Sequence, residues 1–88
     1  MNLVYTSQFK KDYKRVSKQG KDFQKLEFII ETLLSKRMLG TKFKDHPLSG
    51  KWKNNRDCHI DSDWVLIYQI TSDSLILERT GSHSDIFK

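Results

Sequence analysis

The fold is decided by one nearly continuous apolar stretch, Trp64-Val65-Leu66-Ile67-Tyr68-Gln69-Ile70. A run of this kind is typical of a strand that is covered on both faces. Turn-forming residues bound it on both sides, at 61–63 (Asp-Ser-Asp) and at 71–74 (Thr-Ser-Asp-Ser). Residues 55–60 before the first turn and 75–80 after the second also have strand character. The second half of the chain therefore predicts a three-stranded antiparallel meander.

Upstream of this meander, the sequence predicts a short strand at residues 3–6 and then a first helix. Ser7 is a suitable N-cap because its hydroxyl can accept a hydrogen bond from a first-turn N–H. Gly20 is expected to end the helix. The apolar face of this helix consists of Phe9, Tyr13 and Val16, at i, i+4 and i+7.

A second amphipathic helix follows, with Asp22 as its expected N-cap and an end near Lys36. Its apolar stripe consists of Phe23, Leu26, Ile29, Ile30, Leu33 and Leu34. Two such helices joined by a short turn are suited to cover a sheet. The expected fold is α+β, with a short N-terminal strand and two helices packed on an antiparallel β-sheet. The length of 88 residues is sufficient for one domain, so residues 1–88 are expected to form one domain.

The segment at 38–54 contains Gly40, Pro47 and Gly50 and shows no sustained periodicity. Loops of this length are uncommon in compact domains and are often functional. His46 lies within it, so this segment could bring a titratable side chain to a site on the sheet.

Composition excludes several classes of protein. No apolar run of about 18 residues is present, so no transmembrane helix is predicted. The N-terminus lacks the pattern of a signal peptide, and the single cysteine, Cys58, excludes an internal disulfide framework. We therefore expect a cytoplasmic protein without a membrane partner.

The charge is unevenly distributed along the chain. The net charge is +5, but residues 1–44 carry +7 and residues 45–88 carry −2. Candidate ribosomal RNA-binding residues on the first helix are Lys10, Lys11, Lys14, Arg15 and Lys18. A second, smaller candidate phosphate-binding group consists of Lys51, Lys53 and Arg56. The alternative is that the lysine-rich helix face is simply solvated.

Four residues of the second half could carry acid–base chemistry: His46, His59, Asp63 and His83. Histidine exchanges protons near neutral pH, and cleavage of a phosphodiester by a ribose 2′-hydroxyl needs one base and one acid. The RNA supplies its own nucleophile in this reaction, so neither a metal nor a protein nucleophile is required. Strand alternation places Cys58 and His59 on opposite faces, which argues against a Cys–His dyad and favours a buried Cys58. Trp64 could either pack in the core or stack on an unpaired base.

Four motifs occur in one order: KDHPL at 44–48, RDCH at 56–59, DWVLIY at 63–68 and RTGSH at 79–83. With them, the sequence resembles the YafQ-type branch of the RelE/ParE toxin superfamily over nearly its whole length. The resemblance implies a microbial-ribonuclease-like α+β fold. It also implies a toxin of a bacterial type II toxin–antitoxin system that cuts mRNA in the ribosomal A site without a metal or other cofactor. The products would be a 2′,3′-cyclic phosphate or 3′-phosphate and a 5′-hydroxyl.

The same resemblance implies roles for individual residues, namely His46, His59, Asp63, Trp64, His83 and Phe87. His83 and Asp63 are expected to transfer protons, with the direction unassigned. His46 and His59 would orient the nucleophile or stabilise the phosphate, and the two aromatic residues of the set would position the base. The implied partners are an acidic antitoxin segment over the active face, the ribosome and mRNA, and operator DNA through the antitoxin complex.

Two other functions compete with this one. A non-catalytic nucleic-acid- or protein-binding toxin, as in the gyrase-directed ParE-like branch, would have no need of the histidine and aspartate set. A ribonuclease acting on free RNA would need an extended RNA groove of its own, whereas a ribosome could supply the positioning that lowers the barrier.

Overall fold

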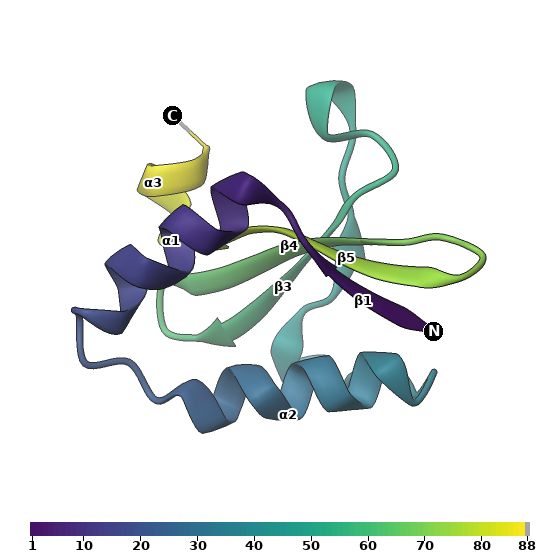
Figure 1. Cartoon of the computed structure of the whole chain (residues 1–88), viewed down its shortest axis with the longest axis horizontal. Helices are drawn as coiled ribbons and strands as arrows, with labels where there is room; N and C mark the ends of the chain where they lie inside the picture. Colours follow the sequence, from purple (N-terminus) through teal and green to yellow (C-terminus); the bar gives the residue numbers. More distant parts are fainter. Residues whose placement is uncertain (88) are drawn as a thin grey trace.

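One mixed five-stranded sheet organises the chain in the computed structural model, which describes residues 1–87 (Figure 1). The strands are β1 (Asn2–Tyr5), β2 (His46–Pro47), β3 (Arg56–Asp61), β4 (Trp64–Ile70) and β5 (Ser74–Gly81). The α-helices are α1 (Ser7–Ser17), α2 (Phe23–Leu34) and α3 (His83–Ile86). Two 3₁₀ turns, Thr41–Phe43 and Gly50–Trp52, interrupt the long connection between α2 and β3. The strands lie in the order β1-β5-β4-β3-β2.

The predicted α+β class, with helices packed on a sheet built around the meander β3-β4-β5, is confirmed. Three details differ from the sequence prediction. β1 pairs with β5 in parallel, so the sheet is mixed and not purely antiparallel. The segment at 38–54 contains the short strand β2, which pairs with β3. The predicted C-terminal tail begins with the short helix α3.

The helix ends follow from side-chain capping. Thr6, not the predicted Ser7, caps α1, since its Oγ1 accepts from the Phe9 N–H at 2.9 Å. Asp22 caps α2 as predicted, accepting from the Gln24 N–H at 3.0 Å. That helix ends at Leu34, two residues before the predicted end. Lys36 adopts a left-handed backbone with φ of 59°, which cannot continue a right-handed helix.

Both faces of the central strand β4 are buried, as its apolar sequence predicts. Trp64, Leu66 and Tyr68 face α1 and α2 and belong to the main core. Val65 and Ile67 face the other way, where Ile86 of α3 covers them. Figure 1 shows α2 below the sheet and α3 above it, with the segment around the 3₁₀ turn Gly50–Trp52 also above. The sheet therefore has a helix-covered face and a second, less covered face that can hold a site.

Trp64 belongs to the core, so the predicted stacking on RNA is wrong and its alternative holds. The side chain is 1% exposed and packs edge-on against Phe23 at 5.7 Å between ring centroids. Its indole N–H donates to Thr80 Oγ1 at 2.9 Å, which satisfies the one polar atom of the ring. Cys58 is also buried on the helix face, as predicted, and burial raises the pKa of its thiol.

Among the described residues, no helix has the length and apolar character needed to cross a bilayer.

Candidate active site

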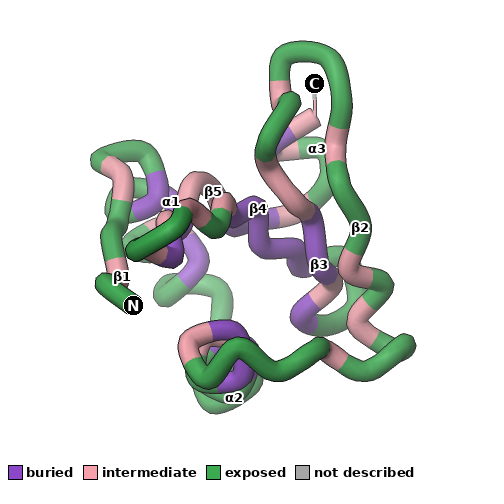
Figure 2. The backbone as a smooth tube through the Cα atoms, turned by 90° about the vertical axis from the view of Figure 1, so that its right-hand side faces the viewer, coloured by how far each residue is buried: buried purple, intermediate pink, exposed green. Residues whose placement is uncertain are grey.

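The three histidines of the chain lie on the face of the sheet opposite α2. His59 is on β3, His46 is on β2, and His83 opens α3 directly after β5. The rings of His59 and His83 are 5.1 Å apart between centroids. Figure 2 shows exposed residues along β2, in contrast to the buried residues of β4. We call His46, His59 and His83 the histidine cluster.

Asp63 holds His83 from the turn between β3 and β4. Its carboxylate accepts from the backbone N–H of His83 at 3.1 Å and lies 3.2 Å from the ring Nδ1. The backbone N–H and then the ring of His83 hold the pKa of Asp63 below its ordinary value. Because an ionised carboxylate only accepts, Nδ1 carries a hydrogen and Nε2 is left to face the open side. Asp63 adopts a left-handed backbone with φ of 47° in this tight turn.

Asp57 lies beneath the histidine cluster, and the sequence-based reasoning gave it no role. It is 3% exposed, and its ligand atom and those of His59 and His83 lie within 4.8 Å of one another. Burial raises the pKa of Asp57, opposed by the charges of His46, His59 and His83. The available signal was strand alternation, because residues 57 and 59 of one strand share a face. A buried carboxylate is thus placed next to the imidazoles of the cluster.

His46 reaches the cluster from the neighbouring strand. It pairs with Asp57 across β2 and β3, and its Nε2 lies 3.7 Å from Asp57 Oδ2. Its Nδ1 is 2.6 Å from the Lys44 carbonyl, which can only accept, so Nδ1 carries a hydrogen. His46 is thus oriented on both sides, by the Lys44 carbonyl at Nδ1 and by Asp57 near Nε2.

An aromatic wall stands beside His83. The Phe87 ring lies 6.1 Å from the His83 ring and packs edge-on against Trp52 at 6.0 Å. Lys51 Nζ lies 6.0 Å from the Trp52 ring, and both Lys51 and Lys53 are exposed. The structure therefore places Phe87 and these lysines on the side of the cluster, where a substrate could contact them.

Two predicted basic site residues are used elsewhere. Arg56 faces the helix side of β3, where its Nε donates to Asp45 Oδ1 at 3.1 Å, because alternation turns it away from His59. Burial lowers the pKa of Arg56, but the bond to Asp45 outweighs this and raises it. Arg15 is half-buried in an internal network. Both side chains are engaged in ion pairs and their RNA-binding roles stay predictions, whereas Lys10, Lys11, Lys14 and Lys18 are exposed on α1 or directly after it.

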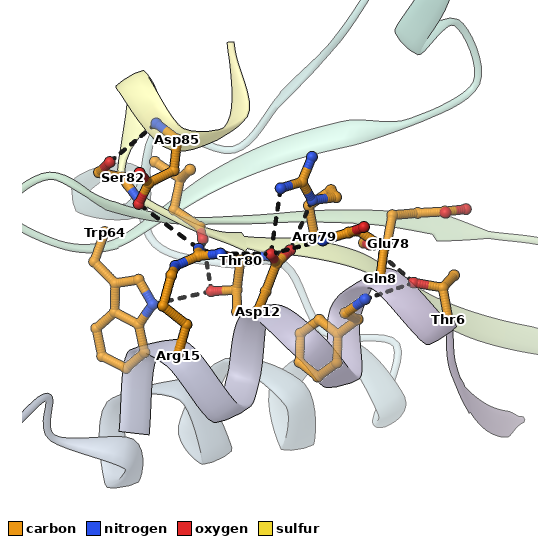
Figure 3. Close-up of polar contacts among 12 residues, drawn as sticks. Thr6, Gln8, Asp12, Arg15, Trp64, Glu78, Arg79, Thr80, Ser82 and Asp85 are labelled. Carbon is orange, nitrogen blue, oxygen red and sulfur yellow. Dashed lines mark hydrogen bonds and ion pairs between the residues drawn. The ribbon is translucent and has the colours of Figure 1, made fainter. Parts of the chain in front are cut away.

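Asp12 is the centre of that network, which joins α1 to the end of β5 (Figure 3). The carboxylate is fully buried and accepts from Arg79 Nε at 2.7 Å, Arg15 Nη1 at 2.9 Å and the Thr80 N–H at 3.2 Å. Burial raises the pKa of Asp12, but these bonds and one from Gln8 together hold it below its ordinary value.

The same network reaches the base of α3. Arg15 Nη2 donates to the Thr80 carbonyl at 3.1 Å and lies 3.6 Å from Asp85 Oδ2. Asp85 and Ser82 form a reciprocal capping box at the start of α3. Gly81 passes so close to Arg15 that a Cβ there would lie 2.5 Å from Nη2. The start of α3, and with it His83, is thereby anchored to α1.

The cluster has the donor set for a metal ion, since Asp57, His59 and His83 could each offer one ligand atom. Imidazole and carboxylate are common ligands of zinc and copper. The chemistry of the site is therefore compatible with either bound metal or direct proton transfer, and the expectation of a metal-free reaction stays a prediction.

Comparison with known proteins identifies the family. The model of the bacterial toxin of type II toxin–antitoxin systems, YafQ, matches residues 1–88. The mRNA interferase toxin YafQ of Escherichia coli strain K12 is 41% identical over 87 residues, covering 98% of this chain and 95% of that protein.

Two solved structures have the same fold. A crystal structure of the E. coli DinJ–YafQ complex matches with a TM-score of 0.91 and 41% identity, covering 99% of this chain and 98% of that one. A copper-bound L66S mutant toxin from Helicobacter pylori matches with a TM-score of 0.94 and 42% identity, covering 99% of both chains. The predicted family and the predicted enzyme class, an mRNA interferase, are confirmed by these relatives. The chain belongs to the YafQ family of bacterial toxins of type II toxin–antitoxin systems.

Proposed function

We propose that the chain is a ribosome-dependent endoribonuclease that cleaves mRNA in the A site and so inhibits translation. The observation that carries the proposal is the convergence of three histidines and two aspartates from β2, β3, the β3–β4 turn and α3 on one face of the sheet. A purely binding toxin needs no such set, which disfavours the gyrase-directed alternative.

The reaction needs two proton transfers, one from the attacking 2′-hydroxyl and one to the leaving O5′, and these two oxygens lie in line through the phosphorus. A neutral imidazole takes the proton of the ribose 2′-hydroxyl, and O2′ attacks phosphorus. The bond from phosphorus to O5′ breaks, and a protonated imidazole gives its proton to O5′. The products are a 2′,3′-cyclic phosphate and a 5′-hydroxyl, and no metal or protein nucleophile takes part.

The contacts favour distinct roles for the site residues. His83 would transfer a proton through Nε2, because Asp63 occupies its Nδ1 side. This gives Asp63 a positioning role in place of the predicted share in proton transfer. His46 and His59 would supply the second proton transfer and stabilise the charged phosphate, and buried Asp57 would stabilise the imidazolium forms.

The substrate and partners follow from the surfaces around the cluster. Phe87 would stack on a base beside the scissile phosphate, and Lys51 and Lys53 would bind flanking phosphates. The exposed lysines of α1 would dock the toxin on ribosomal RNA. By likeness to the DinJ–YafQ complex, a cognate antitoxin would bind this chain, and the pair would bind operator DNA through the antitoxin. With such partners, the protein would act in the cytoplasm.

Primer-extension mapping of mRNA ends on programmed ribosomes tests the proposal. The wild type is expected to cut in the A-site codon, and His83→Ala is expected to cut about 10²–10⁴-fold more slowly, the usual contribution of a general acid or base. The proposal fails if the wild type leaves the mRNA intact, or if His83→Ala cuts at the wild-type rate.

A further inference from the structure

A cleft of about 660 Å³ adjoins the histidine cluster at the edge of the sheet. It lies between the N-terminal half of α2, the end of β3 and the 3₁₀ turn Thr41–Phe43 with the residue that follows it. The residues that line it include His59, so the cleft borders the strand that carries one member of the histidine cluster. Its volume is within the range of ligand pockets. We call it the basic cleft, after its lining residues Lys25, Lys42 and Lys44.

The uncompensated charge in the basic cleft is positive. Lys42 and Lys44 form no ion pair with any residue from 1 to 87. The two carboxylates of the cleft are both engaged: Asp61 pairs with Lys25 at 2.7 Å, and Asp22 caps α2. An anion entering the cleft would therefore meet two free ammonium groups and two carboxylates that are already neutralised or hydrogen-bonded.

An aromatic platform lies next to these lysines. Phe28 is 55% exposed, and its ring stacks on that of Phe43 with 6.0 Å between centroids. Lys42 Nζ lies 5.1 Å from the centroid of Phe43. Lysines beside an exposed aromatic ring are the combination that binds single-stranded nucleic acid, with phosphates on the cations and a base on the ring.

We propose that the basic cleft binds the mRNA strand on one side of the scissile phosphate, with phosphates on Lys42 and Lys44 and a base stacked on Phe28. This proposal rests on the proposed function. RNA is favoured over an acidic peptide because the cleft borders β3 at His59, near the proposed position of the scissile phosphate, and because Phe28 offers a stacking surface that carboxylates do not use.

Cleavage on programmed ribosomes at subsaturating toxin tests the proposal with two double variants. Lys42→Ala/Lys44→Ala removes the two free charges. Lys36→Ala/Arg37→Ala is the matched control, since it removes two charges at the far end of α2. Each pair also contains one lysine with a left-handed backbone, Lys36 with φ of 59° and Lys44 with φ of 50°.

The cleft variant is expected to cut about tenfold more slowly than the control, and Phe28→Leu to lose a similar factor. Thermal melting of each variant accompanies the assay, and rates are compared per folded molecule. A cleft variant that cuts as fast as the control overturns the proposal, whereas an uncut wild-type sample refutes the proposed function itself.

Crosslinking separates mRNA from other occupants of the cleft. 4-Thiouridine is placed in the mRNA at each position next to the cut, and toxin carrying His83→Ala is irradiated on the ribosome. A crosslink to the peptide containing Phe28 or to residues 42–44 supports the proposal. Crosslinks confined to other peptides, or a cleft variant that loses only antitoxin binding, contradict it.

Discussion

Asp57 is unfavourable for the stability of the fold but suited to a role in the site. It is buried, and its Oδ1 has no hydrogen-bond partner among the described residues. An ionised carboxylate in such a place is costly, which is why burial raises its pKa. Its nearest charged neighbours are imidazoles, which would have to gain and lose protons in the proposed reaction. We therefore assign Asp57 to the chemistry of the site and not to the stability of the fold.

Asp57→Asn is expected to slow cleavage by about a hundredfold or more. Because the raised pKa means that folding favours the protonated carboxyl, the wild type loses stability as pH rises through that pKa, and the variant does not. At pH 8 the Tm of the variant should be unchanged or higher, by up to roughly 5 °C. Calorimetry and the ribosome assay check this together, and a less stable variant with normal cleavage would refute it.

Trp64 illustrates the opposite case. The family resemblance implies a role for it at the site, but its side chain packs inside the fold. Trp64→Phe removes the N–H that donates to Thr80. The free energy of unfolding is expected to fall by about 1–3 kcal/mol, the usual cost of a lost buried hydrogen bond and reduced packing. The KM for ribosome-bound mRNA should not change. A raised KM in a variant of normal stability, measured by urea unfolding, would instead support a stacking role.

Among the elements, α3 decides where His83 lies. It has only four residues, His83–Ile86, and is too short to be stable by itself. Ile86 packs on the sheet, the Ser82–Asp85 capping box closes its first turn, and Arg15 reaches Asp85 from α1. The position of a proposed catalytic residue thus depends on an ion pair with a helix on the other face of the sheet.

Asp85→Asn is expected to lower kcat by about three- to tenfold, since a small misplacement of a catalytic group is costly. The Tm should change little, because the side chains of Arg15 and Asp85 are 38% and 40% exposed. An ion pair as exposed as this contributes little to stability. Glu78→Gln, which removes a charge from β5 without contacting α3, is the control. If KM rises and kcat is unaffected, the positioning role is wrong.

The elements that the sequence predicts well are those whose signals are local. The run 64–70 and its flanking turns define the meander, and alternation within β3 separates Cys58 from His59. The remaining features depend on contacts between distant segments. Asp12 and Arg79 are 67 residues apart, so no spacing rule joins them. The partner of His46 could not be read from the sequence either, because β2 has only two residues and no strand pattern.

At the scale of the whole molecule, the +7 and −2 halves do not form separate surfaces. Arg15 of the basic half pairs with Asp85 of the acidic half, and Lys25 pairs with Asp61 across the basic cleft. The charges that stay free lie on α1, around the 3₁₀ turn Gly50–Trp52 and in the basic cleft. RNA would therefore meet the toxin on several sides of the histidine cluster and not on one basic face.

Global stability should depend on pH through Asp12. A carboxylate whose pKa is depressed in the folded state contributes stability above its unfolded pKa, near the ordinary 3.8, and loses it as pH falls through the folded pKa. The free energy of unfolding should therefore decline between about pH 5 and pH 2. Asp12→Asn is expected to cost about 3–5 kcal/mol at pH 7, because it leaves Arg79 partly unpaired.

Urea unfolding across this pH range compares the wild type with Asp12→Asn. The acid decline should be shallower in the variant, since the interactions of the Asp12 carboxylate are absent. Parallel curves for the two proteins would show that another group controls acid stability.

In the proposed reaction, the histidine cluster activates the RNA's own 2′-hydroxyl. The most direct measurement places a single 2′-deoxynucleotide immediately 5′ of the scissile phosphate in mRNA on programmed ribosomes and follows cleavage by wild-type toxin. We expect the deoxy mRNA to stay intact at this position, while the all-ribose mRNA yields a 2′,3′-cyclic phosphate and a 5′-hydroxyl. Cleavage of both mRNAs at the same rate would contradict it.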